Sequence, residues 1–372
     1  MGLLRSECMG LKGWLRIALG GWLLCGMAWA NATSVVFLNP GRSDEPFWTS
    51  YSRFMQAAAD DLGMQLSILY AERDNVRMLH QAREVLGGEQ RPDYLLFVNE
   101  QSAAPEILRL AVDSGVKLFM VNNGLTADQQ AVLGTSREKF PDWIGTLIPD
   151  NEQAGYLMAK ELIRLHQGKA GSAPLDMLAF SGARSTPASQ ERERGLHRAL
   201  AEHPEVRLRQ LVQGDWSRQR AYEQAGLLLP RYPQVGLIWS ANDEMAFGAM
   251  RALEERGGHP GRDVLFSALN NSPEVLQARI EGRVSVLVAG HFTLGGWALV
   301  LLHDHAAGVD FAYRGGKDRL EPDLFALLDA RQAGRMLQHL QRKDFGLDFR
   351  SFSAVGHPER RDYRFSLQPL LD

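Results

Sequence analysis

Amide, arginine and aromatic side chains recur where short apolar runs end along this sequence. Asn99, for example, follows the run D-Y-L-L-F-V at 93–98, and Asn122 follows V-K-L-F-M-V at 116–121. Amides both donate and accept hydrogen bonds, arginine supplies forked donors, and aromatic faces pack on C–H surfaces. This mixture suits a polyhydroxylated ligand. The candidate ligand-binding residues are Glu45, Phe47, Trp48, Asn99, Asn122, Asn123, Arg194, Trp216, Asn242, Asn270 and His291.

Each candidate also has a purely structural interpretation. An asparagine at the end of a strand is often a turn residue that bonds its own backbone. Phe47 and Trp48 are adjacent and cannot both face one core, so we expect one of them to project outwards. The charged run at 191–194 could be the solvated face of a helix.

Several motifs that mark common enzymes are missing from the sequence. We find no G-x-x-x-x-G-K-[ST] loop, no G-x-G-x-x-G after the first apolar run, no H-E-x-x-H and no G-x-S-x-G. The only cysteines, Cys8 and Cys25, lie in the first thirty residues, and no histidine pair has metal-ligand spacing on a predicted helix. We therefore expect no catalytic residue, no cofactor and no metal.

An alternation of apolar runs with helical patterns positions these side chains. Pro46, for instance, opens a helix in which Phe47, Tyr51, Phe54 and Leu62 fall at helical spacing. The predicted strands are 34–39, 64–70, 93–99, 116–122, 175–181, 206–212, 235–240, 263–269 and 284–289. The predicted helices are 46–62, 76–86, 105–114, 151–166, 187–201, 217–229, 242–256, 273–281 and 294–306, with one more helical pattern from Leu324 to Leu340.

Strands that alternate with crossover helices form parallel sheets covered by helices on both faces. About ten such units exceed one sheet of ordinary width, so we predict an α/β fold of two doubly wound parallel-sheet lobes. Ligands of open α/β sheets bind beyond the carboxyl ends of the strands, where the candidate residues fall.

The first thirty residues read as a signal peptide. Arg5, Lys12 and Arg16 precede an apolar run from Ile17 to Trp29, and Ala28-Trp29-Ala30 resembles a cleavage site. An uncleaved anchor is the alternative, but the run is shorter than the roughly 20 residues that span a bilayer. Lipidation at Cys25 is disfavoured because Leu24 stands where a small residue is needed. We therefore expect a periplasmic protein.

Composition is that of a soluble globular chain, with 45% hydrophobic residues, 23% charged residues and a net charge of −3 over 372 residues. There is no basic excess to bind nucleic acid and no acidic block typical of a disordered tail. We expect a monomer.

Five stretches together resemble the sugar-type (type I) periplasmic binding proteins, the family of ribose- and galactose-binding proteins. They are N-P-G-R-S-D-E-P-F-W at 39–48, I-P-D-N-E-Q-A-G at 148–155, Q-E-R-E-R-G-L at 190–196, W-S-A-N-D-E-M-A-F-G-A-M-R-A-L at 239–253 and A-L-N-N-S-P-E-V at 268–275. A further stretch, G-H-F-T-L-G-G-W-A-L at 290–299, is similar to a branch that includes the autoinducer-2 receptor.

The resemblance implies two lobes joined by a three-strand hinge, with the ligand in the cleft between them. It places lobe 1 at 33–148 plus about 291–320, and lobe 2 at 149–290 plus about 321–372. It also implies that Phe47 or Trp48 from one lobe and Trp216 from the other stack on the ligand.

Two departures from the family pattern affect the expected ligand. Asn122 and Asn270 stand where sugar binders commonly have aspartate, whereas Arg194 still falls on a ligand position of the family. We hypothesise a less acidic pocket that suits a modified sugar, a polyol derivative or a ligand with some negative charge. The leading function is capture of a small polar solute for an ABC permease. The alternative is a receptor that docks to the periplasmic domain of a membrane sensor kinase or cyclase.

Overall fold

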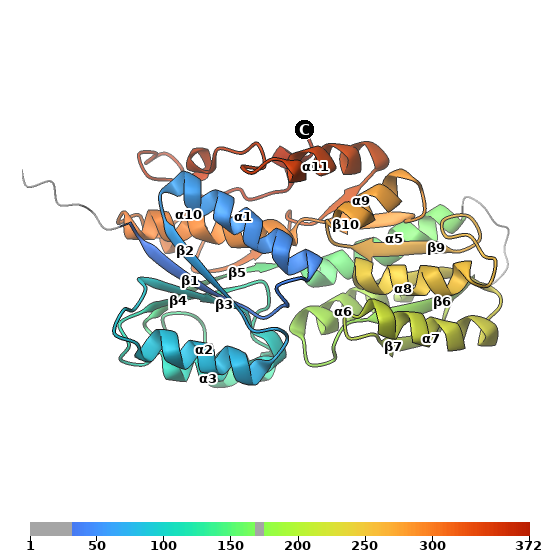
Figure 1. Cartoon of the computed structure of the whole chain (residues 1–372), viewed down its shortest axis with the longest axis horizontal. Coiled ribbons are helices and arrows are strands. Elements are labelled where there is room, and N and C mark those ends of the chain that lie inside the picture. The colour runs from blue at the N-terminus through green and yellow to red at the C-terminus, as the bar shows by residue number, and fades with distance from the viewer. Residues whose placement is uncertain (1–31, 168–174) are drawn as a thin grey trace, which may run out of the picture. The chain divides into compact units, whose positions relative to one another are not determined.

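The computed structural model describes residues 32–167 and 175–372, and its strands form two separate sheets (Figure 1). The first sheet has the order β11-β5-β4-β3-β1-β2, and every pair of neighbouring strands in it is parallel. Its strands are β1 (Ser34–Asn39), β2 (Gln65–Tyr70), β3 (Tyr94–Phe97), β4 (Lys117–Val121), β5 (Trp143–Pro149) and β11 (Asp318–Glu321). The predicted signal peptide of residues 1–30 lies outside the described residues.

The second sheet repeats this arrangement in the order β12-β10-β9-β8-β6-β7. The strand β12 is antiparallel to β10, and the other pairs are parallel. Its strands are β6 (Leu175–Ser181), β7 (Val206–Gln213), β8 (Val235–Ser240), β9 (Leu265–Leu269), β10 (Val286–Ala289) and β12 (Ala326–Leu328). The predicted fold class, two α/β lobes built on parallel sheets, is confirmed.

Helices cover both faces of the first sheet, with α1 and α10 on one side and α2 and α3 on the other (Figure 1). In the second lobe, α5 and α8 pack on the sheet, α6 packs on α5 and α7 packs on α8. The helices are α1 (Pro46–Leu62), α2 (Asn75–Gly87), α3 (Ala104–Leu110), α4 (Ala127–Leu133), α5 (Asn151–Gln167), α6 (Pro187–Glu202), α7 (Arg218–Arg231), α8 (Asp243–Glu254), α9 (Pro273–Ile280), α10 (Leu294–Ala306) and α11 (Ala330–Gln341). No helix in the described part of the chain is long and apolar enough to cross a bilayer.

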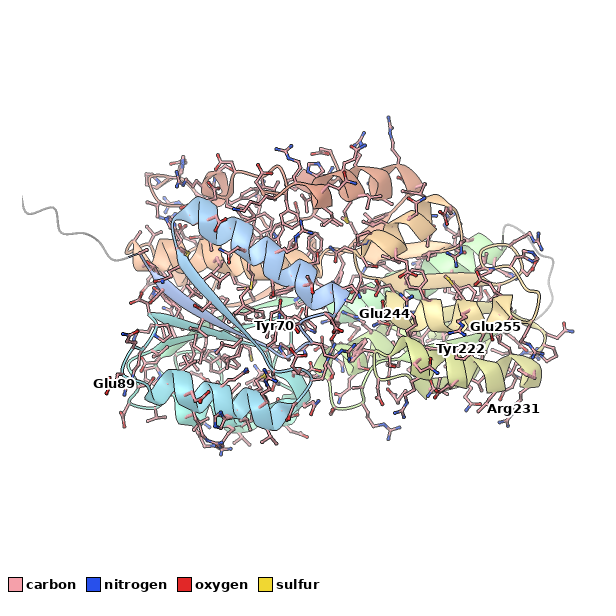
Figure 2. All side chains as sticks on the ribbon, viewed as in Figure 1. Tyr70, Glu89, Tyr222, Arg231, Glu244 and Glu255 are labelled. Atoms are coloured by element: carbon pink, nitrogen blue, oxygen red, sulfur yellow. The ribbon has the colours of Figure 1, made fainter. Side chains whose placement is uncertain are left out.

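Local sequence signals account for the ends of these helices. Pro46 stands at the first turn of α1, and Gly63 ends the helix in the left-handed conformation at φ 70°. Asp74 caps α2 by accepting hydrogen bonds from the backbone of Val76 and Arg77. Tyr222 of α7 donates a hydrogen bond of 2.7 Å to Glu255 at the end of α8, which joins the two helices (Figure 2).

The chain passes between the two lobes three times, after β5, after β10 and between β11 and β12. At the second passage, Gly290 has φ 147°, and a Cβ built on it would lie 2.0 Å from the carbonyl oxygen of Leu324. Only glycine allows the second and third passages to approach so closely.

Three strands and one helix were not predicted, namely β5, β11, β12 and α4. Gly145 interrupts the apolar pattern of β5, where a Cβ would lie 2.7 Å from the carbonyl oxygen of Lys317. The same glycine lets β11 pair closely with β5. Both β11 and β12 are short strands whose pairing depends on residues far away in sequence, so a local pattern cannot predict them.

The segment after α11, residues 342–372, packs against the first lobe, whereas α11 itself packs on α9 of the second. Phe345 and Phe349 meet Phe54 of α1 at ring-centroid distances of 5.0 and 5.2 Å. Phe365 stacks on Trp297 of α10 at 5.2 Å. The chain from α11 onwards is therefore shared between the lobes, with α11 on the second lobe and the C-terminal segment of residues 342–372 on the first.

Candidate functional site

A cavity lies between the two lobes, where the carboxyl ends of the strands of both sheets meet. It has about 410 Å³ of empty space, counting the open solvent at its mouth, and is lined by Glu45, Phe47, Trp48, Arg73, Glu100, Asn122, Asn123, Thr186, Ala188, Arg192, Trp216, Asn242, Asn270 and His291. Each lining residue follows a strand in the chain, from Glu45 after β1 to His291 after β10. The parallel topology thus brings together side chains that are far apart in the sequence.

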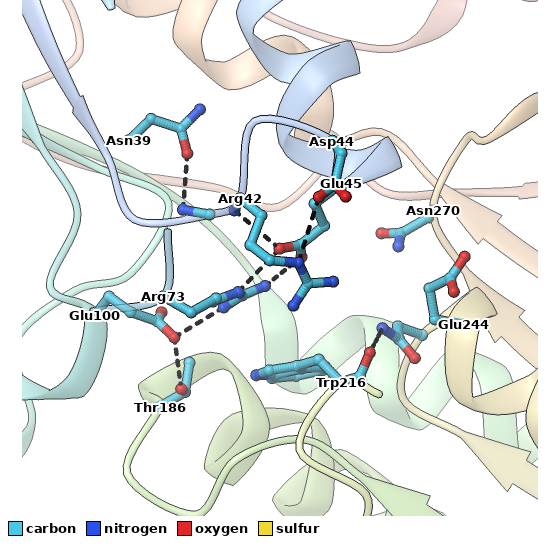
Figure 3. A network of polar contacts seen from close by, with 12 residues as sticks. Asn39, Arg42, Asp44, Glu45, Arg73, Glu100, Thr186, Trp216, Glu244 and Asn270 are labelled. Atoms are coloured by element: carbon cyan, nitrogen blue, oxygen red, sulfur yellow. Dashed lines mark hydrogen bonds and ion pairs between the residues drawn. The ribbon is translucent and has the colours of Figure 1, made fainter. Parts of the chain in front are cut away.

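On the first-lobe side, Arg73 is held between two carboxylates (Figure 3). Its Nε donates to Oε2 of Glu45 at 3.0 Å, and its Nη1 donates to Oε1 of Glu100 at 3.1 Å. Its Nη2 also donates to Oε1 of Glu45. The forked guanidinium matches the carboxylate geometry, so these three side chains form a rigid ion-paired cluster on the first-lobe side of the cavity.

Glu100 is almost fully buried and gathers donors from both lobes. Asn123 donates to its Oε2 at 2.9 Å, and Thr186 of the second lobe donates to its Oε1 at 3.1 Å. Burial raises the pKa of Glu100, and the attraction of Arg73 opposes that rise. The bond from Thr186 joins the lobes directly across the cavity (Figure 3).

The indole rings of two tryptophans, one from each lobe, pack closely against the backbone of a glycine. A Cβ on Gly41 would lie 1.9 Å from Cδ1 of Trp48, and a Cβ on Gly182 would lie 2.0 Å from Cζ2 of Trp216. Both rings therefore require a residue without a side chain behind them. Phe47 lines the same cavity and stacks on the imidazole of His291 with centroids 4.3 Å apart.

The asparagines of the site differ in how their amides are used. Asn242 caps α8 by accepting from the backbone N–H of Met245 at 2.9 Å, and Asn270 donates to Oδ1 of Asp243 at 2.6 Å. Within residues 32–167 and 175–372, by contrast, no donor reaches the buried Oδ1 atoms of Asn122 and Asn123. Buried amide oxygens without a partner are costly, so these atoms are available for a ligand.

Arg192 and His291 supply the remaining polar groups. Arg192 is 4% exposed, and its guanidinium lies over the ring of Trp216 with Cζ 5.6 Å from the centroid. His291 is also buried, and its Nδ1 has no hydrogen-bond partner in the part of the chain that the structure describes. Burial, together with the charge of Arg192, lowers the pKa of His291, so the imidazole is neutral near pH 7. The described residues contain no cluster of three or more His, Cys, Asp or Glu that could hold a metal ion.

Comparison with known families identifies the class of protein. Residues 35–310 match the family described as a periplasmic binding protein domain. The chain belongs to the periplasmic binding proteins.

Relatives of this binding protein bind sugars. The galactofuranose-binding protein YtfQ of Escherichia coli is 20% identical over 268 residues, covering 71% of this chain and 79% of YtfQ. The ribose import binding protein RbsB of Salmonella typhimurium is 24% identical over 262 residues, covering 70% of this chain and 80% of RbsB. The structure of a periplasmic sugar-binding protein from Pseudomonas fluorescens is 56% identical, with a TM-score of 0.85, and covers 91% of this chain and 100% of that one. These relatives are binding proteins and not enzymes, as the missing motifs predict. The likeness to the autoinducer-2 receptor stays a prediction.

Most of the residues singled out from the sequence line the cavity of this binding protein, namely Glu45, Phe47, Trp48, Asn122, Asn123, Trp216, Asn242, Asn270 and His291. Phe47 and Trp48 both line the cavity at the first turn of α1, but Trp48 is buried in the core whereas Phe47 is only partly buried.

Asn99 and Arg194 lie elsewhere. The side chain of Asn99 accepts from the N–H of Ala104 at 3.0 Å and donates to the carbonyl of Gly124 at 2.8 Å, so it holds two loops together. Arg194 is exposed and pairs with Glu152 at 3.3 Å. Residues two apart on a helix point about 200° apart, so Arg192, and not Arg194, faces the cavity.

The sequence reasoning missed Arg73, Glu100, Thr186, Ala188 and Arg192 as lining residues. Arg73 could have been found from the sequence, because it comes three residues after β2, at the carboxyl end of a predicted strand. Arg192 could have been separated from Arg194 by helical phase. Glu100 also corrects the expectation of a pocket poor in acid groups, since it places a second carboxylate beside Glu45.

Proposed function

We propose that this binding protein captures a small sugar-like ligand in the cavity between its lobes and delivers it to an ABC permease. The observation that carries the proposal is the lining itself: tryptophans from both lobes beside buried amide oxygens that the described residues leave without donors. Hydroxyl groups would donate to Asn122 and Asn123, and the C–H faces of a sugar ring would pack on Trp48 and Trp216.

Closure of the two lobes around the ligand fits the three passages of the chain between them. We propose that the lobes comprise 33–148 plus about 291–320 and 149–290 plus about 321–372, with the last segment shared between them. A hinge motion at the passages would open the cavity, and closure would exclude water from the ligand. We also propose that residues 1–30 direct export to the periplasm and are then removed.

Delivery to a permease is favoured over reporting to a membrane sensor by the names of the relatives, of which RbsB is an import binding protein. The two roles are separated by the partner. Import predicts that the ligand-loaded protein stimulates ATP hydrolysis by a permease encoded beside it. Signalling predicts instead that it changes the activity of a neighbouring sensor kinase or cyclase.

A thermal-shift screen of the mature chain against monosaccharides, polyols, sugar acids and amino acids tests the proposal. A ligand at a hundredfold excess over its Kd stabilises the folded state by about 2.7 kcal/mol, which raises Tm by several degrees. We expect a sugar or sugar derivative to give such a shift, and Trp216→Ala to abolish it. Tyr222→Phe, on the outer side of α7, is the matched control and keeps the shift. A response to amino acids alone would contradict the proposal.

A further inference from the structure

The chain joins the two lobes a fourth time, beyond the three passages between the sheets. The helix α11 packs on α9 of the second lobe, and the C-terminal segment of residues 342–372 then packs on α1 and α10 of the first. Figure 1 shows α11 and this segment running along the top of the molecule, across both lobes. They lie beyond residue 310, where the match to the family ends. Together they form a strap, a name that we keep for α11 plus residues 342–372.

The strap is bound to the first lobe at the point where it leaves α11. Nη2 of Arg53 on α1 donates to the carbonyl oxygen of Leu340 in α11 at 2.9 Å, and its guanidinium lies over the ring of Phe345 with Cζ 5.5 Å from the centroid. Nζ of Lys343 lies 3.0 Å from Oδ2 of Asp60, which is also on α1. Because α11 is packed on the second lobe, the bond from Arg53 is an interlobe contact that lies outside the cavity.

Buried aromatic side chains hold the strap on the first lobe beyond this point. Phe345 and Phe349 are fully buried, and both contact Phe54 of α1. The backbone N–H of Phe349 also donates to Oδ2 of Asp61 at 2.6 Å. Withdrawal of these rings into water would expose their apolar surface, so this half of the strap moves with the first lobe.

The other half of the strap, α11, moves with the second lobe. Met336 of α11 is fully buried, and Nε of Arg279 on α9 donates to the carbonyl oxygen of Leu328, just before α11, at 2.8 Å. The end of the chain returns to this helix, because Nη1 of Arg335 donates to the carbonyl oxygen of Leu371 at 2.6 Å. The bond from Arg335 is therefore a second link between the two halves of the strap.

A hinge motion that opens the cavity also moves the two halves of the strap relative to each other. It changes the position of α11 relative to α1, so the bonds of Arg53 with Leu340 and of Arg335 with Leu371 must stretch or break. Hydrogen bonds with a charged donor are among the stronger ones in proteins. The open form thus loses interactions that the closed form keeps, and the equilibrium between the two forms shifts toward closure.

We propose that the strap restrains the opening of the lobes, so that the ligand-free protein populates the open form less and a bound ligand is released more slowly. The inference goes beyond the proposed function, because the restraint acts on the lobes themselves and does not depend on which ligand the cavity binds. It assigns a role to a part of the chain that lies outside both sheets and outside the cavity.

Pulsed electron paramagnetic resonance measures the distance between spin labels on the two lobes without any ligand. Val76→Cys on α2 and Leu227→Cys on α7 supply the label positions, since both side chains are 77% exposed and residues 32–372 contain no cysteine. Both helices lie at the bottom of the molecule in Figure 1, opposite the strap. We expect one main distance in this labelled protein. Adding Arg53→Ala and Arg335→Ala should raise the fraction of molecules at longer distances at least threefold.

Arg331→Ala is the matched control, because it removes an exposed arginine from the same helix α11 and should leave the distances unchanged. Either single substitution, Arg53→Ala or Arg335→Ala, gives the same comparison with a smaller shift if the doubly substituted protein does not fold. Identical distance distributions with and without these substitutions would overturn the inference and leave the proposed function intact.

The rate of ligand release supplies a second measurement. For whichever of D-ribose, D-allose and D-galactose changes the tryptophan fluorescence, the dissociation rate should rise at least threefold when Arg53→Ala and Arg335→Ala are combined, and stay unchanged in Arg331→Ala. An unchanged rate in the doubly substituted protein would contradict the inference. A failure of all three sugars to bind would count against the proposed function alone, since the distances are measured without ligand.

Discussion

Thr186 of the second lobe donates a hydrogen bond of 3.1 Å to Oε1 of Glu100 in the first lobe. Both side chains are buried, and each lies at the edge of the proposed ligand cavity. The bond can form only when the lobes are close together, so it stabilises the closed form directly. It also supplies one of the donors that keep the Glu100 carboxylate buried beside Arg73.

Thr186→Val tests this relationship. The variant keeps the size of the side chain but leaves Glu100 short of one donor, at a cost of about 1–3 kcal/mol. We expect the ligand that gives the largest thermal shift to bind roughly 5- to 150-fold more weakly, mainly through faster dissociation. Ser185→Ala, at an exposed neighbour, should bind normally. Equal affinities for Thr186→Val and the unmodified protein, measured by calorimetry, would show that the bond does not hold the lobes closed.

Gly182 and Gly226 make a matched pair of glycines with opposite expected effects. A Cβ on Gly182 would overlap the ring of Trp216, whereas nothing lies within 4 Å of a Cβ on Gly226 inside α7. Gly182→Ala should displace Trp216 and weaken ligand binding at least tenfold. Gly226→Ala should leave binding unchanged and raise the free energy of unfolding by about 0.5–1 kcal/mol, because alanine favours the helix. Normal binding by Gly182→Ala would exclude Trp216 from the ligand contacts.

Asp243 should make the stability of the protein depend on pH. Burial, and next the charge of Glu244, raise the pKa of Asp243 to about 6, above the value of about 4 in an unfolded chain. The folded state thus binds this proton more tightly, and the stability it contributes is complete below about pH 4 and lost as the pH rises through 6.

Asp243→Asn removes this titration. Between pH 4 and pH 7, the free energy of unfolding of the unmodified protein should fall by on the order of 2 kcal/mol relative to that of the variant. Urea unfolding at several pH values measures the difference. Parallel pH profiles for the two proteins would rule out the raised pKa.

Asp304 anchors the C-terminal segment to α10. Its buried carboxylate accepts hydrogen bonds from Oη of Tyr363 at 2.7 Å, from the N–H of Ala354 at 2.5 Å and from the hydroxyl of Ser353. Asp304→Asn places an amide N–H₂ against these donors and should destabilise the fold by about 1–3 kcal/mol. Because Asp304 lies outside the cavity, ligand affinity measured well below the melting temperature should not change. A loss of affinity without loss of stability would show that the segment takes part in binding.

The alternation of strands and helices could be predicted from the sequence because each element carries its own periodic pattern. The pattern fails at β5, β11 and β12, where pairing is decided by distant segments and by a glycine that permits close approach. The C-terminal segment is another such case. Its aromatic residues pack against Phe54 and Trp297, which lie on helices far away in sequence, so no local pattern predicts where they pack.

Most of the candidate site could be predicted because ligands of parallel sheets bind beyond the carboxyl ends of the strands, which lie at one edge. This principle gives the position of a residue but not its hydrogen-bond partner. The side chain of Asn99, after β3, is hydrogen-bonded to the backbone of Ala104 and Gly124, while its neighbour Glu100 reaches the cavity. For Arg192 and Arg194, the helical phase of α6 decides which side chain faces the cavity, and this phase can be read from the sequence. The prediction of Arg194 in place of Arg192 was wrong for that reason.

Titration of the intrinsic tryptophan fluorescence tests most directly whether a sugar-like ligand occupies the cavity between the lobes, because Trp48 and Trp216 both line it. The ligands are D-ribose, D-allose, D-galactose, D-galacturonate and D-gluconate, and the proteins are the mature chain, Arg192→Gln and Arg194→Gln. We predict a saturable change with at least one ligand, weakened at least tenfold in Arg192→Gln and unchanged in Arg194→Gln. A saturable change that both variants share equally, or no saturable change with any of these ligands, would contradict the account.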